Sequence, residues 1–168
     1  MEESFLIRGK VVKYGHNIDT DVIFPGKYLG LTDEKIIAQH AMEGLDADFY
    51  NKVRRGYNII VAGSNFGCGS SREQAPLSLK LAGVKLVIAE SFARIFFRNS
   101  ININLPVLIC KGVTDKISDG DEVKANLATG EIKNLTRKTS IRAEPYPPHI
   151  LDMLKVGGLI KYVKKRLE

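Results

Sequence analysis

The sequence predicts a single α/β domain that spans all 168 residues. Three apolar runs, at 59–62, 84–89 and 106–110, alternate with two segments of helical pattern, at 73–82 and 92–102. Strands that alternate with helices through short connections usually run parallel and are joined by right-handed crossovers. The length is sufficient for one hydrophobic core, so we expect this parallel unit to be the middle of a mixed α/β fold.

The segments before this unit have the patterns of a strand and of two helices. Short apolar runs in residues 5–14 predict one or two strands, and the polar segment 17–21 predicts a turn. A helix is expected over 33–43, where Asp33 can cap the first turn, and a shorter helix over 46–53.

After the last apolar run the pattern changes. Two segments, 122–127 and 131–135, flank a turn at 128–130 and predict an antiparallel hairpin. Beyond a proline-rich connector, two short helices are expected on either side of Gly157 and Gly158.

The composition predicts a cytoplasmic protein without a membrane partner. Hydrophobic residues make up 44% and charged residues 26%, and no apolar run approaches the roughly 20 residues that span a bilayer. The first residues are acidic and lack the pattern of a signal peptide. The two cysteines, Cys68 and Cys110, are too few for a disulfide framework, a zinc site or an iron–sulfur cluster held by this chain alone.

The formal charge of +6 raises the question of nucleic acid. The lysine and arginine residues are spread along the chain, with one cluster at 161–166. Such a tail is more often a solvated helix face than a binding arm, so nucleic acid is not an expected partner.

The glycine-rich turn at 63–73 is the most informative segment, since it follows a predicted strand and opens onto a predicted helix. In such a turn backbone N–H groups point at one place, where the helix start adds partial positive charge. Two hydroxyls, of Ser70 and Ser71, and the guanidinium of Arg72 stand there. This combination suits an anion, and a carboxylate best.

The same turn also has a purely structural interpretation, in which the serines cap the helix. Ser70 with Glu73, or Ser71 with Gln74, has the spacing of a capping box. Two nucleotide-binding patterns do not fit. A P-loop needs a lysine directly before Ser70, and the dinucleotide fingerprint needs a glycine on the helix side of the turn.

Two further groups of residues each have two interpretations. Asp19 and Asp21 are spaced to hold a hard cation such as magnesium, although such pairs more often only form turns. In the helix at 92–102, Arg94 and Arg98 lie on one face, which is either solvated or in contact with a carboxylate or a partner. Its core stripe is expected to be Phe92, Ile95 and Phe96.

Three motifs, in this order and spacing, identify a family resemblance: Asp19-Thr20-Asp21, the segment 65–73 and the segment 91–96. From about Gly9 to Tyr162 the chain resembles the small subunit of isopropylmalate isomerase (3-isopropylmalate dehydratase), its homoaconitase relatives and the mobile C-terminal domain of aconitase. The resemblance implies the swivelling β/β/α fold. It also implies a hydro-lyase subunit of leucine biosynthesis, which moves the hydroxyl of a small dicarboxylic hydroxy acid by removing and re-adding water.

The resemblance further implies a partner, a cofactor and the roles of individual residues. The implied partner is a large subunit, with which the chain forms a heterodimer or heterotetramer. The implied cofactor is a four-iron cluster (4Fe–4S) held by that large subunit. By this resemblance the chain itself binds no cofactor and is inert alone. Ser70 matches the general base, Arg72 the residue that grips a substrate carboxylate, and Ser71 adds a hydrogen bond. Thr20 and Asp21 match the turn that lines the site. The supporting residues are Gly67, Gly69, Arg94 and Arg98.

Substrate choice in this family is attributed to the following loop, here Lys27, Tyr28, Leu29, Gly30 and Leu31. Homoaconitase-like members carry an arginine near the positions of Gly30 and Leu31. An apolar loop penalises a third carboxylate and accepts an alkyl group, which favours isopropylmalate. Because Gly30 is unusual and Lys27 can reach a carboxylate, three related enzymes stay open as alternatives: homoaconitase, citraconate/methylmalate dehydratase and 2,3-dimethylmalate dehydratase. A separate alternative is a non-catalytic module that binds carboxylates or RNA.

Overall fold

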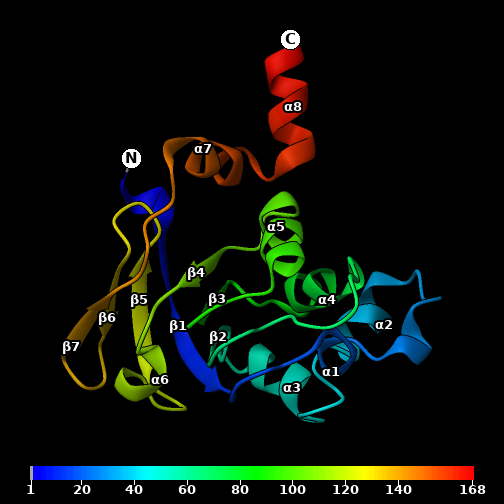
Figure 1. Cartoon of the computed structure of the whole chain (residues 1–168), viewed down its shortest axis with the longest axis horizontal. Helices are drawn as coiled ribbons and strands as arrows, with labels where there is room; N and C mark the ends of the chain where they lie inside the picture. The colour runs from blue at the N-terminus through cyan, green and yellow to red at the C-terminus, as the bar shows by residue number, and fades with distance from the viewer. Residues whose placement is uncertain (1) are drawn as a thin grey trace.

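A computed structural model describes residues 2–168. Its framework is one seven-stranded sheet with the strand order β4-β3-β2-β1-β5-β6-β7 (Figure 1). The strands are β1 (Leu6–Lys13), β2 (Ile59–Ala62), β3 (Leu86–Ala89), β4 (Val107–Ile109), β5 (Glu122–Asn126), β6 (Glu131–Asn134) and β7 (Thr139–Arg142). Because β1 lies in the middle, the first strand of the chain joins the two halves of the sheet.

One half of the sheet is parallel, as predicted. β1, β2, β3 and β4 pair in this order, with Val12 opposite Ile60 and Ile88 opposite Leu108. Every residue of β2 and of β3 is buried. Continuous apolar strands are typical of parallel sheets that are covered on both faces.

The other half is antiparallel. β5 and β6 form the predicted hairpin, and β5 pairs with β1 on its other side. β7, which the sequence did not predict, adds to β6 as the edge strand. Its residues are mostly exposed, so it lacks the apolar pattern that identified the other strands.

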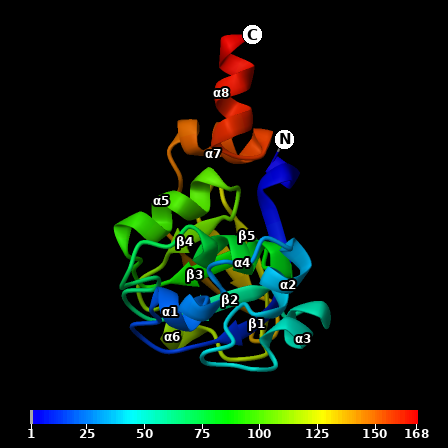
Figure 2. The same cartoon turned by 90° about the vertical axis from the view of Figure 1, so that its right-hand side faces the viewer.

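Helices connect and cover the strands. The α-helices are α1 (Thr20–Ile23), α2 (Glu34–Gln39), α3 (Phe49–Arg54), α4 (Gln74–Ala82), α5 (Arg94–Asn102), α6 (Val113–Lys116), α7 (Pro148–Val156) and α8 (Leu159–Leu167), and the 3₁₀ helices are η1 (Glu2–Phe5) and η2 (Gly26–Tyr28). α4 packs against α2 and α5, and α7 packs against α5 and α8. α8 extends away from the body of the molecule, with the C-terminus at its free end (Figure 2).

The start of α4 differs from the sequence-based prediction, whereas the start of α2 agrees with it. Both capping boxes are wrong, because α4 begins only at Gln74 and the N-cap position is Glu73, whose side chain makes no capping hydrogen bond. Ser70 and Ser71 therefore lie ahead of the cap. The cap of α2 is as predicted, since Asp33 accepts hydrogen bonds from the backbone of Lys35 and Ile36.

The hydrophobic core surrounds the parallel strands. On α5, Phe96 is buried in this core as expected, but Ile95 is 51% exposed and does not belong to the core stripe. In residues 2–168 we find no helix that has the length and apolar character needed to cross a membrane.

Candidate active site

The glycine-rich turn after β2 is joined to the loop that follows β1. The Gly67 N–H donates to the carbonyl of Ile18 (2.7 Å), and the Thr20 N–H donates to the carbonyl of Cys68 (2.8 Å). Both loops leave the carboxyl ends of parallel strands, which is where open α/β sheets bind their ligands.

The turn is joined in the same way to the segment that leads into α5. Phe66 donates to the carbonyl of Ser91 (3.0 Å) and accepts from the N–H of Ala93 (2.9 Å). Gly67 has a φ of +82°, and a Cβ atom added there would come within 2.2 Å of the Phe96 ring. Only glycine therefore allows the turn to lie this close to α5.

Ser70 lies at the surface of the turn. Its carbonyl accepts a hydrogen bond from Oγ1 of the buried Thr20 (2.8 Å). In the part of the chain that the structure describes, the Ser70 hydroxyl has no hydrogen-bond partner, and the N–H groups of 69–72 donate to no protein acceptor. These donors are available to a ligand.

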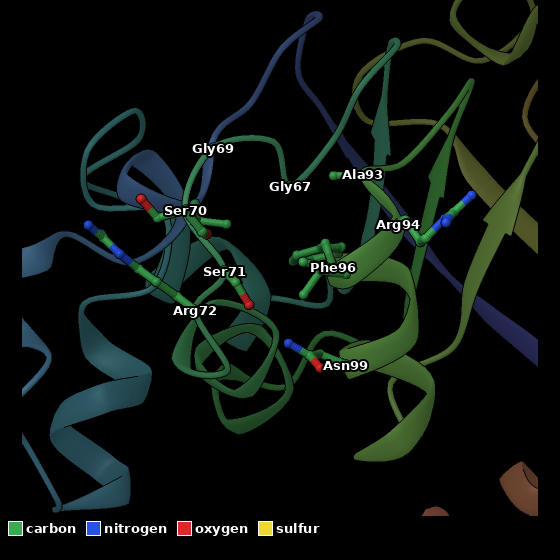
Figure 3. A pocket seen from close by; sticks show the side chains of 11 residues that line it. Gly67, Gly69, Ser70, Ser71, Arg72, Ala93, Arg94, Phe96 and Asn99 are labelled. Atoms are coloured by element: carbon green, nitrogen blue, oxygen red, sulfur yellow. The ribbon is translucent and has the colours of Figure 1, made fainter.

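A pocket of about 280 Å³ lies between this turn and the first half of α5. Ile95, Phe96 and Asn99 form its helical wall. Figure 3 shows the Ser71 side chain pointing across the pocket toward Asn99, whereas Ser70 and Arg72 point to one common side, away from α5.

Arg72 forms an ion pair at the edge of the pocket. Its Nη1 donates to Oδ1 of Asp21 (2.7 Å) and to the carbonyl of Phe24 (3.2 Å). The hydrogen bond from Arg72, followed by one from the Gly26 N–H, holds the pKa of Asp21 below its usual value. Asp21 therefore stays ionised at neutral pH and fixes the guanidinium beside the turn.

Residues 7–111 match the family of the Aconitase C-terminal domain. The matched segment is more than half of the chain and contains every residue that lines the pocket. The chain belongs to the aconitase C-terminal domain family. The α/β fold and the family resemblance inferred from the sequence are thereby confirmed.

Curated relatives match the chain along almost their whole length. The "Isopropylmalate/citramalate isomerase small subunit" of Methanocaldococcus jannaschii is 52% identical over 162 residues, which are 96% of each chain. The "3-isopropylmalate dehydratase small subunit" of Caldanaerobacter subterraneus is 50% identical, over 96% of this chain and 99% of that one. A crystal structure of 3-isopropylmalate dehydratase from M. jannaschii superposes with a TM-score of 0.90 at 47% identity, over 96% of this chain and 95% of that one.

The structure brings most of the predicted site residues together. The predicted residues that line the pocket are Thr20, Gly67, Gly69, Ser70, Ser71, Arg72 and Arg94. Asp21 joins them through its ion pair with Arg72. Arg98 and the loop 27–31 do not line the pocket, although the backbone of Gly26, at the loop start, lies beside the Arg72 guanidinium.

Four residues that line the pocket were not predicted for the site: Ala93, Ile95, Phe96 and Asn99. Ile95 was assigned to the core, and Asn99 was not considered. The two lie four positions apart on α5 and therefore share a face. The spacing therefore indicates that Ile95 and Asn99 lie on the same side of α5. It does not indicate whether that side is buried in the core or faces a pocket.

Metal-binding side chains are not gathered anywhere in residues 2–168: no group of three or more His, Cys, Asp or Glu is placed to hold an ion. Asp19 instead caps α1 by accepting from the N–H of Val22. Cys110 is buried, and this burial, with the charge of Glu90, raises the pKa of its thiol to about 11. The two cysteines of the sequence are fewer than the three or four thiolates that hold an iron–sulfur cluster.

Proposed function

We propose that this chain is the small subunit of a 3-isopropylmalate dehydratase, a hydro-lyase of leucine biosynthesis in the cytoplasm. The observation that carries the proposal is the likeness over nearly the full length to small subunits of that name. Two free cysteines, one of them buried, are consistent with a reducing compartment.

In this proposal Ser70 takes the proton from the carbon next to the leaving hydroxyl. A serine alkoxide is stable only where positive dipoles surround it, and the free N–H groups of 69–72 are such dipoles. Arg72 holds a substrate carboxylate through the edge of its guanidinium that Asp21 leaves free, and Ser71 adds a hydrogen bond. Thr20 fixes the Ser70 backbone.

The large subunit supplies the remaining chemistry. Because Cys68 and Cys110 are too few to hold a four-iron cluster, such a cluster would be held by the large subunit, where it would supply a Lewis acid for the departing hydroxyl. The pocket opens between the turn and α5, where Ile95 and Arg94 are exposed and accessible to a second subunit. The isolated chain is therefore inert, and the partners form a heterodimer or heterotetramer.

The substrate is a dicarboxylic hydroxy acid with an alkyl group. Leu29 is 37% exposed and Leu31 packs against the core, so the loop presents apolar surface. A second candidate activity, on citramalate, is favoured by the name of the M. jannaschii relative, which includes both acids. Leu29 and Leu31 would accept a methyl group as well as an isopropyl group, with smaller buried area.

Replacement of the proposed base tests this function. Ser70→Ala in the assembled two-subunit enzyme should lower kcat by about 10²- to 10⁴-fold, the usual contribution of a general base. Ser140→Ala, at an exposed position of β7, is the matched control and should leave turnover unchanged. Association with the large subunit, measured by co-purification, should be the same for both variants. Full turnover by the Ser70 variant would reject Ser70 as the base, and a wild-type enzyme inactive on both acids would reject the proposed function.

A further inference from the structure

Three side chains outside the pocket, Tyr28, His40 and Glu43, make a compact cluster that we call the Tyr28 clamp. The Tyr28 ring stacks on His40 with 3.8 Å between centroids and 13° between planes. The Tyr28 hydroxyl donates to Oε1 of Glu43 (2.9 Å), and Nδ1 of His40 contacts Oε2 of the same carboxylate. Burial would raise the pKa of Glu43, but the hydrogen bonds from His40 and Tyr28 outweigh it and keep the pKa low. An ionised carboxylate thus holds both partners.

The clamp is one of two points at which the loop is bonded to the domain. Within the described residues, two hydrogen bonds that involve a side chain connect 26–31 with the rest of the chain: Gly26 N–H to Oδ1 of Asp21 (2.9 Å) and the Tyr28 hydroxyl to Glu43. The Tyr28 N–H also donates to the carbonyl of the adjacent Pro25 (3.0 Å). The other recorded bonds of these residues are local, such as Leu31 N–H to the carbonyl of Tyr28 (3.0 Å). Without the clamp the middle of the loop would have no side-chain hydrogen bond to the segment that follows α2.

The first of these bonds links the loop to the substrate-binding arginine. The same Oδ1 of Asp21 accepts from Gly26 and from Arg72 (2.7 Å). A hollow of about 250 Å³, lined among others by Asp21, Lys27 and Glu43, lies beside this junction. Movement of the loop into this space would displace Gly26 and change the position of the Arg72 guanidinium.

We propose that the Tyr28 clamp positions the loop 27–31 for discrimination between alkyl groups of the substrate. This inference rests on the proposed function, in which the loop meets the alkyl group. Tyr28, His40 and Glu43 act as positioning residues: they hold Leu29 and Leu31 in one place, so that a large alkyl group finds a fixed apolar surface. A loose loop would lose more contact with an isopropyl group than with a methyl group.

Matched substitutions separate the clamp from the stability of the fold. Tyr28→Phe removes the hydroxyl and keeps the stack, whereas Tyr50→Phe removes a hydroxyl that bonds only the exposed Arg54. Glu43→Leu removes both acceptor oxygens, whereas Glu43→Gln keeps one for Tyr28. In the assembled enzyme, the ratio of kcat/KM for isopropylmalate to that for citramalate should fall about tenfold for Tyr28→Phe and Glu43→Leu, mainly through KM for isopropylmalate. Tyr50→Phe and Glu43→Gln should stay near the wild-type ratio.

A second measurement does not depend on turnover. Lys27 is an exposed trypsin site within the loop, and Glu43→Leu leaves its peptide bond unchanged. Cleavage after Lys27 in the free chain should be several-fold faster for Glu43→Leu than for wild type or Glu43→Gln. Equal cleavage rates would overturn the clamp, and faster cleavage with an unchanged substrate ratio would overturn its role in discrimination. If the wild-type enzyme turned over neither acid, the proposed function would fail while the cleavage rates still tested the clamp.

Discussion

Arg72 shows how a single side chain can be fixed before a ligand arrives. Its Nη1 is used by Asp21 and by the carbonyl of Phe24, while Nε and Nη2 have no hydrogen-bond partner in the described residues. A planar guanidinium can thus be held on one side and bind a carboxylate with the other. The ammonium group of lysine carries its three donors on one nitrogen and has no planar edge, so lysine at this position could not offer the substrate carboxylate a bidentate pair while it contacts Asp21.

Arg72→Lys should therefore weaken substrate binding in the assembled enzyme. The loss of a charge-assisted hydrogen bond costs about 1.5–3 kcal/mol, which corresponds to a fall in kcat/KM of about ten- to a hundredfold. Arg54→Lys, at an exposed position of α3, is the control and should have wild-type kinetics. Steady-state kinetics of both variants would check this, and an unchanged KM for Arg72→Lys would contradict the assignment.

At the scale of elements, the glycine-rich turn and α5 form the pocket because they are packed in contact. The sequence predicted both elements and their parallel strands, because apolar runs are local signals. It also predicted Ser70 and Arg72 as site residues, because the glycine–serine–arginine motif is a local signal too. It did not predict the exposure of Ile95 or the stack of Tyr28 on His40. These depend on which helix faces meet in three dimensions, which a periodic pattern does not specify. β7 was missed for a similar reason, since its exposed residues show no burial pattern.

Gly67→Ala tests the contact between the turn and α5. The new Cβ would meet the Phe96 ring at 2.2 Å and force a positive φ on alanine. Gly56→Ala imposes the same backbone strain, at φ +99°, in open space and is the matched control. Urea unfolding of the free chain should show a loss of about 1–3 kcal/mol more for Gly67→Ala than for Gly56→Ala. Equal losses would mean that Phe96 moves aside without cost.

At the scale of the whole molecule, Asp121 stabilises the junction between the two halves of the sheet. Its carbonyl accepts from the Val11 N–H of β1 (2.8 Å), and its buried carboxylate accepts from the N–H of Ser118, from Asn134 and from Arg137. Burial would raise the pKa of Asp121, but these hydrogen bonds outweigh it and lower the pKa below its ordinary value of 3.8. The ionised side chain therefore contributes to the free energy of unfolding at neutral pH.

The pH dependence of stability follows from this shift. A carboxylate whose pKa is depressed in the folded state stabilises the fold above its unfolded pKa, and the contribution is lost as pH falls below about 4. Asp121→Asn should lower the free energy of unfolding by about 1–3 kcal/mol at pH 7, and the difference from wild type should shrink between pH 4 and pH 2. Asp152→Asn, at an exposed position of α7, is the control. Chemical denaturation across this pH range checks the prediction, which a constant difference would contradict.

The position of β1 in the sheet affects how the protein is made. In the chain β1 precedes both of its partners: its parallel partner β2 begins at residue 59 and its antiparallel partner β5 at residue 122. During synthesis one edge of β1 therefore remains unpaired until β5 has been made. An unpaired strand edge is a template for pairing with other chains, so aggregation through β1 competes with folding until β5 covers that edge.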